Sequence, residues 1–183
     1  GGGQLGRMLA EAAARLGFRV IVLDPVAGCP AARFCDRHIV AAYDDRPALD
    51  ELAAHCDVAT FEFENIDLGA LEHLSARIPV HPDVWALRVT QDRLTEKTFL
   101  RETGIDTAPF RAVDGVPQLE MALADIDGHG AILKTRRFGY DGKGQIRFRH
   151  DAGDPAPEAA MERIGGAPSI LEGFVDFDCE ISV

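Results

Sequence analysis

A glycine-rich, basic stretch is the most chemically suggestive part of this 183-residue chain. It follows the apolar residues 131–133, and its four cations are Lys134, Arg136, Arg137 and Lys143. Glycines at 139, 142 and 144 leave its backbone free to approach a ligand closely. Cations and backbone N–H groups in such a loop bind phosphates well, whereas a long hairpin with a solvated basic edge would share the composition. We therefore expect a lid over phosphates, with a plain surface hairpin as the alternative.

A second glycine motif opens the chain. Gly1, Gly3 and Gly6 have the spacing of a dinucleotide-binding fingerprint, and Asp24 stands at about the 20-residue distance of its usual acidic partner. The glycines allow a tight turn, and the following helix would offer free N–H groups and a positive dipole to a phosphate. Any nucleotide or phosphate ligand would suit this motif as well as NAD would. A NAD-binding oxidoreductase module is therefore one alternative.

Two carboxylates, Glu62 and Glu64, alternate with phenylalanines directly after a predicted strand. The two-residue period of a strand would place both carboxylates on one face and both rings on the other. Open α/β sheets bind ligands at the carboxyl ends of their strands, so these carboxylates could receive hydroxyl or amine groups. An exposed acidic strand end would show the same pattern.

Three more charged residues are candidates whose settings also allow ordinary structural roles. Glu172 lies in an apolar strand pattern, where a carboxylate is costly to bury unless a donor meets it. Glu180 follows eight residues later, and separate salt bridges would explain both carboxylates. Arg93 lies in a helical stretch and would, without other context, be an exposed helix cation.

Composition excludes several classes of protein. The formal net charge of -11 and the pI of about 4.9 argue against a general nucleic-acid-binding surface. The four cysteines form no Cys-x-x-Cys pair and fit reduced thiols better than a disulfide frame or a zinc site. No membrane-spanning run or signal peptide is visible, so we expect a cytoplasmic protein without a membrane partner. The glycine start and the apolar end predict a fragment that is cut at both ends.

Alternating strands and helices must position the candidate residues of the first half. A helix is predicted to begin after Gly3 and to end at Gly17, with an apolar stripe at helical spacing. The stripe consists of Leu5, Met8, Leu9, Ala12, Ala13 and Leu16. Strands are predicted at 20–23, 39–41, 58–61 and 78–80, with helices between them. This alternation predicts an α/β fold in which residues 1–90 form a doubly wound parallel sheet.

The second half, residues 91–183, is predicted to form an α+β domain. A helical stretch runs from about residue 84 to residue 100, and further helices are expected at 119–126 and 159–164. Strands are expected on both sides of the basic loop, at 131–133 and 146–149, and a buried strand covers 169–175.

Five blocks of sequence resemble those of the ATP-grasp carboxylase-type ligases, and most closely the family of 5-(carboxyamino)imidazole ribonucleotide synthetases of purine biosynthesis. The blocks are residues 3–8 (GQLGRM), 61–65 (FEFEN), 92–97 (DRLTEK), 132–137 (ILKTRR) and 139–145 (GYDGKGQ). They span nearly the whole chain, and the first and last blocks are specific to this branch. The resemblance implies a substrate-binding, Rossmann-like pre-ATP-grasp domain over residues 1–90. It implies the first part of an ATP-grasp domain over residues 91–183.

The resemblance also implies roles for individual residues. Arg93 and Lys134 would contact the phosphates of ATP, and Lys134 and Lys143 would be the catalytic cations. The lid over the nucleotide would consist of Gly139, Tyr140, Asp141, Gly142, Lys143, Gly144 and Gln145. Adenine would be received by Glu172 and the backbone of Gly173, Phe174 and Val175, and the ribose hydroxyls by Glu180. The substrate contacts would be Gln4, Leu5, Glu62 and Tyr140.

The reaction implied by the resemblance is ATP-dependent carboxylation of 5-aminoimidazole ribonucleotide with bicarbonate, through carboxyphosphate. Magnesium would accompany ATP, with ligands in a later part of the ATP-grasp domain, so we expect no metal ligand within these residues. The implied partners are these small molecules and a second subunit in a homodimer, with no nucleic acid. Another ATP-grasp ligase, such as a formate-dependent glycinamide ribonucleotide transformylase, is an alternative, and a non-catalytic binding module is a further one.

Overall fold

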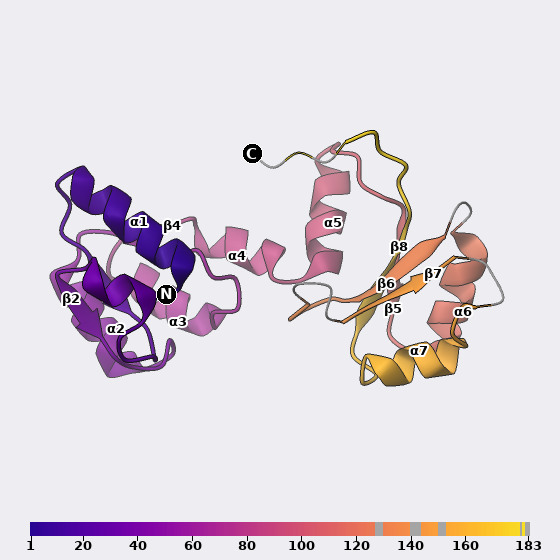
Figure 1. Cartoon of the computed structure of the whole chain (residues 1–183), viewed down its shortest axis with the longest axis horizontal. Coiled ribbons are helices and arrows are strands. Elements are labelled where there is room, and N and C mark those ends of the chain that lie inside the picture. Colours follow the sequence, from indigo (N-terminus) through magenta and orange to yellow (C-terminus); the bar gives the residue numbers. More distant parts are fainter. Residues whose placement is uncertain (127–129, 140–143, 150–152, 180, 182–183) are drawn as a thin grey trace. The chain divides into compact units, whose positions relative to one another are not determined.

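The structure is a computed structural model that describes residues 1–126, 130–139, 144–149, 153–179 and 181. The chain divides into two compact units, Gly1–Arg88 and Val89–Val183 (Figure 1). Each unit has its own buried hydrophobic clusters. No helix in the described part of the chain is long and apolar enough to cross a membrane.

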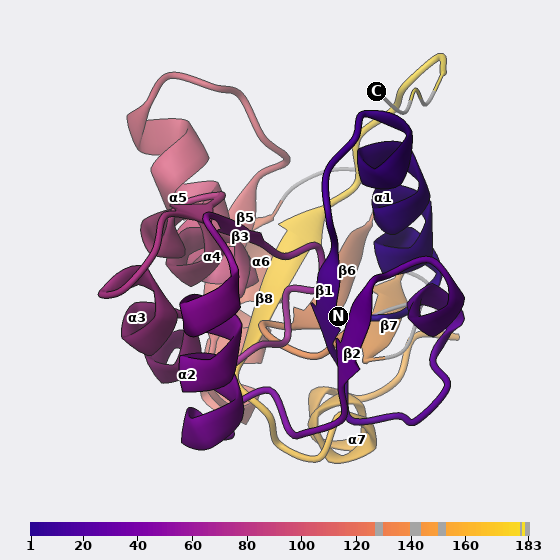
Figure 2. The same ribbon diagram turned by 90° about the vertical axis from the view of Figure 1, so that its left-hand side faces the viewer.

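The first unit alternates helices with short parallel strands. Its elements are α1 (Gln4–Arg15), β1 (Ile21–Leu23), the 3-10 helix η1 (Pro30–Arg33), β2 (Arg37–Ile39), α2 (Arg46–His55), β3 (Ala59–Thr60), α3 (Leu68–Ser75), β4 (Val80–His81) and the start of α4 (Val84–Thr90). Strand β1 pairs in parallel with β2 (Figure 2), and β3 pairs in parallel with β4. The predicted α/β class is confirmed. The described strands of this unit form two separate parallel pairs where one continuous sheet was predicted.

Helix α1 forms as predicted, but it buries a different face. Its small residues Gly6 and Ala10 are buried, whereas Leu5, Met8 and Leu16 of the apolar stripe are 60%, 57% and 77% exposed. A side chain at position 6 would overlap the carbonyl oxygen of Gly1. The backbone of α1 therefore approaches Gly1 too closely for a large side chain at position 6. The small residues Gly6 and Ala10 face inward, and the large apolar residues face solvent.

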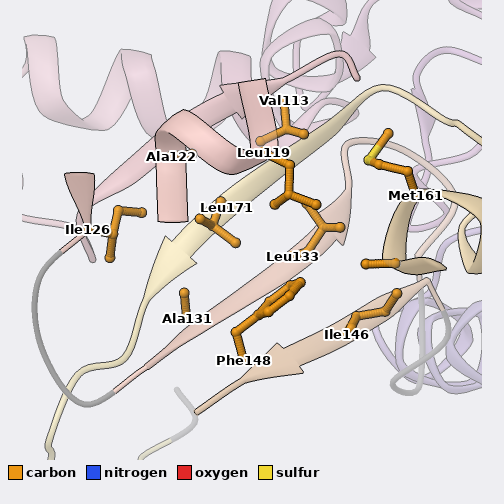
Figure 3. Close-up of a cluster of buried hydrophobic side chains, with 11 residues drawn as sticks. Val113, Leu119, Ala122, Ile126, Ala131, Leu133, Ile146, Phe148, Met161 and Leu171 are labelled. Carbon is orange, nitrogen blue, oxygen red and sulfur yellow. The ribbon is translucent and has the colours of Figure 1, made fainter. Parts of the chain in front are cut away.

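The second unit is built on a four-stranded antiparallel sheet. Its elements are α5 (Arg93–Glu102), β5 (Phe110–Val113), α6 (Val116–Asp125), β6 (Ala131–Thr135), β7 (Gln145–Phe148), α7 (Pro157–Arg163) and β8 (Ser169–Gly173), and the strand order is β5-β8-β6-β7. One face of the sheet forms a core with α6 and α7, which includes Leu119, Leu133, Phe148, Met161 and Leu171 (Figure 3). The α+β character of this half agrees with the prediction.

The predicted helical stretch from residue 84 to residue 100 is interrupted at Gln91 and Asp92. The Asp92 side chain caps α5, because its Oδ1 accepts hydrogen bonds from the backbone N–H groups of Leu94 and Thr95, both at 3.0 Å. Such capping compensates for the absence of intrahelical partners in the first turn. The chain therefore starts a new helix here, which places Arg93 at a helix beginning.

Candidate functional site

The central strands of the second unit carry charged side chains on the sheet face that α6 and α7 do not cover. Leu133 and Leu171 point into the core, so the alternation of a strand directs their neighbours Lys134 and Glu172 to the other face. Glu172 lies opposite Ile132 in the β6–β8 register, which makes Lys134 its diagonal neighbour.

Lys134 and Glu172 are joined directly. Lys134 Nζ donates a hydrogen bond of 2.8 Å to Glu172 Oε2, and Lys97 of α5 places its Nζ 3.6 Å from the same oxygen. The side chain of Glu172 is only 9% exposed. The sequence predicted Lys134 and Glu172 for different parts of one nucleotide, and the structure brings them together. Lys97, which the sequence reasoning left without a role, is part of the same cluster.

Arg93 is tied to the glycine-rich loop. Its Nη2 donates to the carbonyl oxygen of Gly139 at 2.8 Å, and its backbone N–H donates to the carbonyl oxygen of Arg136 at 3.0 Å. Its Nε is buried and has no hydrogen-bond partner within the described residues. Arg93 is therefore a partly shielded cation with one unused donor at the base of the loop.

Arg136 is held by Asp92 in a bidentate ion pair. The guanidinium donates through Nε to both carboxylate oxygens, at 3.1 and 2.9 Å, and Nη2 lies 2.8 Å from Oδ2. Burial raises the pKa of the Asp92 carboxyl. The hydrogen bonds from Arg136 and Thr95 outweigh this effect and hold the pKa below its usual value. Arg137 donates to Gln91 Oε1 at 3.2 Å and lies over the Phe138 ring. Both arginines thus fix the base of the loop to the α4–α5 connection.

The described ends of the glycine-rich loop have constrained backbones. Phe138 has a φ of 61° and Gly144 a φ of 67°, a region that side chains normally disfavour. A side chain on Gly144 would also lie 2.6 Å from Thr135 Oγ1, while the backbone of Thr135 donates to Gly144 at 2.9 Å. Gln145 begins β7 opposite Lys134. The predicted lid residues Tyr140, Asp141, Gly142 and Lys143, and the predicted ribose contact Glu180, lie outside the described residues.

The segment after Glu172 is partly engaged already. The backbone N–H of Gly173 donates to Pro109 at 2.9 Å, and that of Phe174 donates to Gly130 at 3.0 Å. Val175 is 52% exposed. These two N–H groups are therefore not free for a nucleotide. Recognition of adenine here would use the backbone carbonyl groups of the segment or the backbone of the exposed Val175.

The glycine turn of the first unit is organised by Asp24. Its Oδ2 accepts hydrogen bonds from Gly2 N at 2.7 Å and from the Tyr43 hydroxyl at 2.8 Å, and its Oδ1 accepts one from Val26 N at 2.8 Å. Burial raises the pKa of this carboxyl, but these donors together hold the pKa below its usual value. Both oxygens are occupied, which disfavours the ribose-binding role that the NAD alternative needs.

Glu62 lies against the same turn. A side chain at Gly1 would come within 3.2 Å of Glu62 Oε1, and one at Gly6 within 3.7 Å. Gln4 and Leu5 begin α1, and no side chain caps this helix because its N-cap residue is Gly3. The turn therefore presents exposed N-terminal helix residues with a carboxylate beside them.

The predicted alternation around Glu62 is wrong in detail. Strand β3 ends at Thr60, so the two-residue period does not continue through the phenylalanines. Phe61 packs against the core. Phe63 is 40% exposed, and its ring is tilted relative to the Tyr43 ring, with 6.2 Å between the two ring centroids.

A metal centre made of protein side chains is not evident in the part of the chain that the structure describes. No group of three or more His, Cys, Asp or Glu side chains there could hold a metal ion. The two glutamates at the candidate sites, Glu62 and Glu172, lie in different units.

Comparison with known proteins assigns both units. Residues 1–91 match the ribonucleotide synthetase preATP-grasp domain, and residues 98–183 match the ATP-grasp domain. The chain therefore belongs to the ATP-grasp proteins, in the group that carries this preceding domain. The class of protein that the sequence predicted is confirmed.

Several relatives of this chain are named N5-carboxyaminoimidazole ribonucleotide synthase. The Brucella melitensis biotype 1 protein of that name is 55% identical over all 183 residues. The ADP complex of a synthetase of this name has a TM-score of 0.88 at 41% identity, and the Aspergillus clavatus synthase with ADP and 5-aminoimidazole ribonucleotide has 0.83 at 32%. Each structure is matched over 97% of this chain. The chain spans about half of its relatives, 50% of the Brucella protein and 46% of each structure.

Proposed function

We propose that the full-length protein carboxylates 5-aminoimidazole ribonucleotide with bicarbonate in an ATP-dependent reaction, giving N5-carboxyaminoimidazole ribonucleotide, ADP and phosphate. The observation that carries the proposal is the Lys134–Glu172 pair on the face of an ATP-grasp sheet that α6 and α7 leave uncovered. The names of the relatives, and the ligands in their solved complexes, support this substrate. The protein is accordingly a carbon–nitrogen ligase of purine biosynthesis.

The second unit would bind ATP. Lys134 and Arg93 would donate to its phosphates. Lys134 carries an ammonium near the end of β6. Arg93 binds Gly139 through Nη2, and its Nε–H has no partner among the described residues. Glu172 would accept a hydrogen bond from the adenine amine. The described loop residues Gly139, Gly144 and Gln145 would contact the phosphates, and we assign the remaining lid contacts to Tyr140–Lys143 and the ribose contact to Glu180.

Phosphoryl transfer depends mainly on positioning and on neutralisation of charge, which these cations would supply. In the proposed reaction a bicarbonate oxygen attacks the γ-phosphorus of ATP, and ADP leaves to give carboxyphosphate. The amine nitrogen of the ribonucleotide then attacks the carboxyl carbon, phosphate leaves, and the nitrogen loses a proton. Lys134 and Lys143 would stabilise the negative charge that develops on the transferred group.

The first unit would bind the ribonucleotide. The uncapped start of α1 offers backbone N–H groups to a phosphate, and Gln4 and Leu5 are exposed there. Glu62 beside the turn would accept hydrogen bonds from the hydroxyl or amine groups of the substrate. We propose residues 1–90 as the substrate domain and residues 91–183 as the first part of the ATP-grasp domain.

Three further assignments belong to the proposal. Magnesium would neutralise the phosphates of ATP when bound, but the described residues offer no cluster of donor side chains for it. A cytoplasmic location fits an enzyme of purine biosynthesis. A homodimer fits the exposed apolar residues Met8, Leu9 and Leu16 on and just after α1, because association would shield them from water.

Phosphate release from ATP by the full-length protein tests the reaction. We expect release that requires both 5-aminoimidazole ribonucleotide and bicarbonate. Release that requires formate and glycinamide ribonucleotide would instead identify the transformylase alternative. Tight binding of NADH without binding of ATP would favour the oxidoreductase alternative.

A further inference from the structure

Lys97 adds a third charge to the Lys134–Glu172 pair. Its Nζ approaches Glu172 Oε2, the same oxygen that accepts the hydrogen bond from Lys134. The side chains of Lys97, Lys134 and Glu172 are 18%, 22% and 9% exposed, so all three are largely shielded from water. Two cations thus share one carboxylate oxygen, and no residue in the described ranges donates a hydrogen bond to Glu172 Oε1.

The two lysines lie at unequal distances from Glu172, and binding of a nucleotide would affect the nearer one. Lys134, at 2.8 Å, is the closer partner of Glu172, yet it is also the cation that the proposed ATP site assigns to phosphate. Glu172 lies on β8, one of the two inner strands of the sheet, and its short side chain cannot follow the longer Lys134 side chain toward a phosphate. A buried carboxylate that loses its partner is costly. Lys97, 3.6 Å away on α5, is the one other described cation in contact with this carboxylate.

We propose that Lys97 is a positioning residue for nucleotide recognition, which holds Oε2 of Glu172 while Lys134 binds a phosphate, so that Oε1 faces the adenine amine. This inference rests on the proposed ATP site and gives Lys97 no phosphate contact of its own. A fixed carboxylate accepts a hydrogen bond from an amino group and repels a carbonyl oxygen in the same place. Lys97 therefore sharpens discrimination between ATP and inosine triphosphate, which has a carbonyl where adenine has its amino group.

Equilibrium titration of the full-length protein with ATP and with inosine triphosphate tests this role. The variants are Lys97→Met and Lys97→Gln, which remove the charge, and Lys97→Arg, which keeps it. Arg101→Met is the matched control, because Arg101 lies one turn further along α5 and stacks on Phe110. Thermal unfolding of each variant shows which of the two neutral variants is folded and suitable for the comparison.

We expect loss of the charge to lower the ratio of ATP affinity to inosine triphosphate affinity by about fivefold or more. Lys97→Arg should recover most of this ratio, and Arg101→Met should leave it unchanged. An equal loss of affinity for both nucleotides, an unchanged ratio, or a wild-type protein without preference for ATP contradicts the role of Lys97. A wild-type protein that binds neither nucleotide contradicts the proposed function itself.

Discussion

Arg136 binds the carboxylate of Asp92 through both Nε and Nη2, and this pair joins the end of β6 to the beginning of α5. The adjacent Arg93 is consequently fixed beside Gly139, with its backbone N–H bound to the carbonyl oxygen of Arg136. The proposed phosphate contact Arg93 thus depends on a structural ion pair that itself contacts no substrate.

Removal of either partner of this pair should destabilise the second unit. We expect Arg136→Gln or Asp92→Asn to lower the free energy of unfolding by about 1.5–3 kcal/mol, since each removes hydrogen bonds to a charged group. Urea denaturation of both variants and of the double variant measures the coupling. The double variant should cost less than the sum of the two, and simple additivity would show that the pair contributes nothing.

The same pair predicts a pH dependence. The pKa of Asp92 is depressed in the folded protein, so its contribution is fully present above the unfolded value of about 4 and is lost as the pH falls through the folded pKa. The difference in unfolding free energy between wild type and Asp92→Asn should therefore be constant near neutral pH and should shrink in acid. A difference that grows as the pH falls would contradict the assignment.

Gly2 should tolerate no side chain. A Cβ at this position would overlap Cys29 Sγ and lie 3.2 Å from Asp24 Cβ, whereas one at Gly3 would meet nothing within 4 Å. We expect Gly2→Ala to cost about 1–3 kcal/mol of unfolding free energy and Gly3→Ala much less. Thermal or chemical denaturation checks both. Adding Cys29→Ala to Gly2→Ala should recover part of the loss, and equal effects at positions 2 and 3 would refute the packing argument.

Lys134→Ala should weaken ATP binding by about 1.5–3 kcal/mol, because it removes a hydrogen bond to a charged phosphate group. Isothermal titration with ATP gives this value directly. Arg163→Ala, a change to an exposed cation on α7, is the control and should bind ATP as the wild type does. Unchanged affinity in Lys134→Ala would remove this lysine from the site.

Glu62→Gln should affect the other substrate. The carboxylate lies beside the glycine turn of the first unit, so its loss should raise the KM for 5-aminoimidazole ribonucleotide more than the KM for ATP. Steady-state kinetics with each substrate varied in turn separates the two effects. A rise confined to the KM for ATP would show that Glu62 does not belong to the ribonucleotide site.

Much of the architecture follows from local sequence patterns. The hairpin strands around the basic loop, the helix after the glycine turn and the apolar strand containing Glu172 are all present, because apolar periodicity and glycine positions report burial and turns directly. The same patterns misjudged α1, since periodicity identifies an apolar stripe but not which face the remaining chain covers.

The connections between charged residues were less predictable. The contact between Lys134 and Glu172 joins residues 38 positions apart and depends on the β6–β8 register. Asp92 could have been recognised as a helix cap from its residue type, but its pairing with Arg136 is a tertiary contact that no local pattern encodes. Composition likewise could not separate Arg136, which pairs with Asp92 at the base of the loop, from Lys134, which pairs with Glu172 on the sheet face that α6 and α7 leave uncovered.

Incorporation of isotope-labelled bicarbonate by the full-length protein tests the central claim most directly. With ATP and 5-aminoimidazole ribonucleotide present, we predict that the labelled carbon appears on the exocyclic amine in equal amount to the ADP formed. Omission of ATP or of the ribonucleotide should abolish incorporation. ADP formation with no labelled carbon in the ribonucleotide product would contradict the proposed reaction.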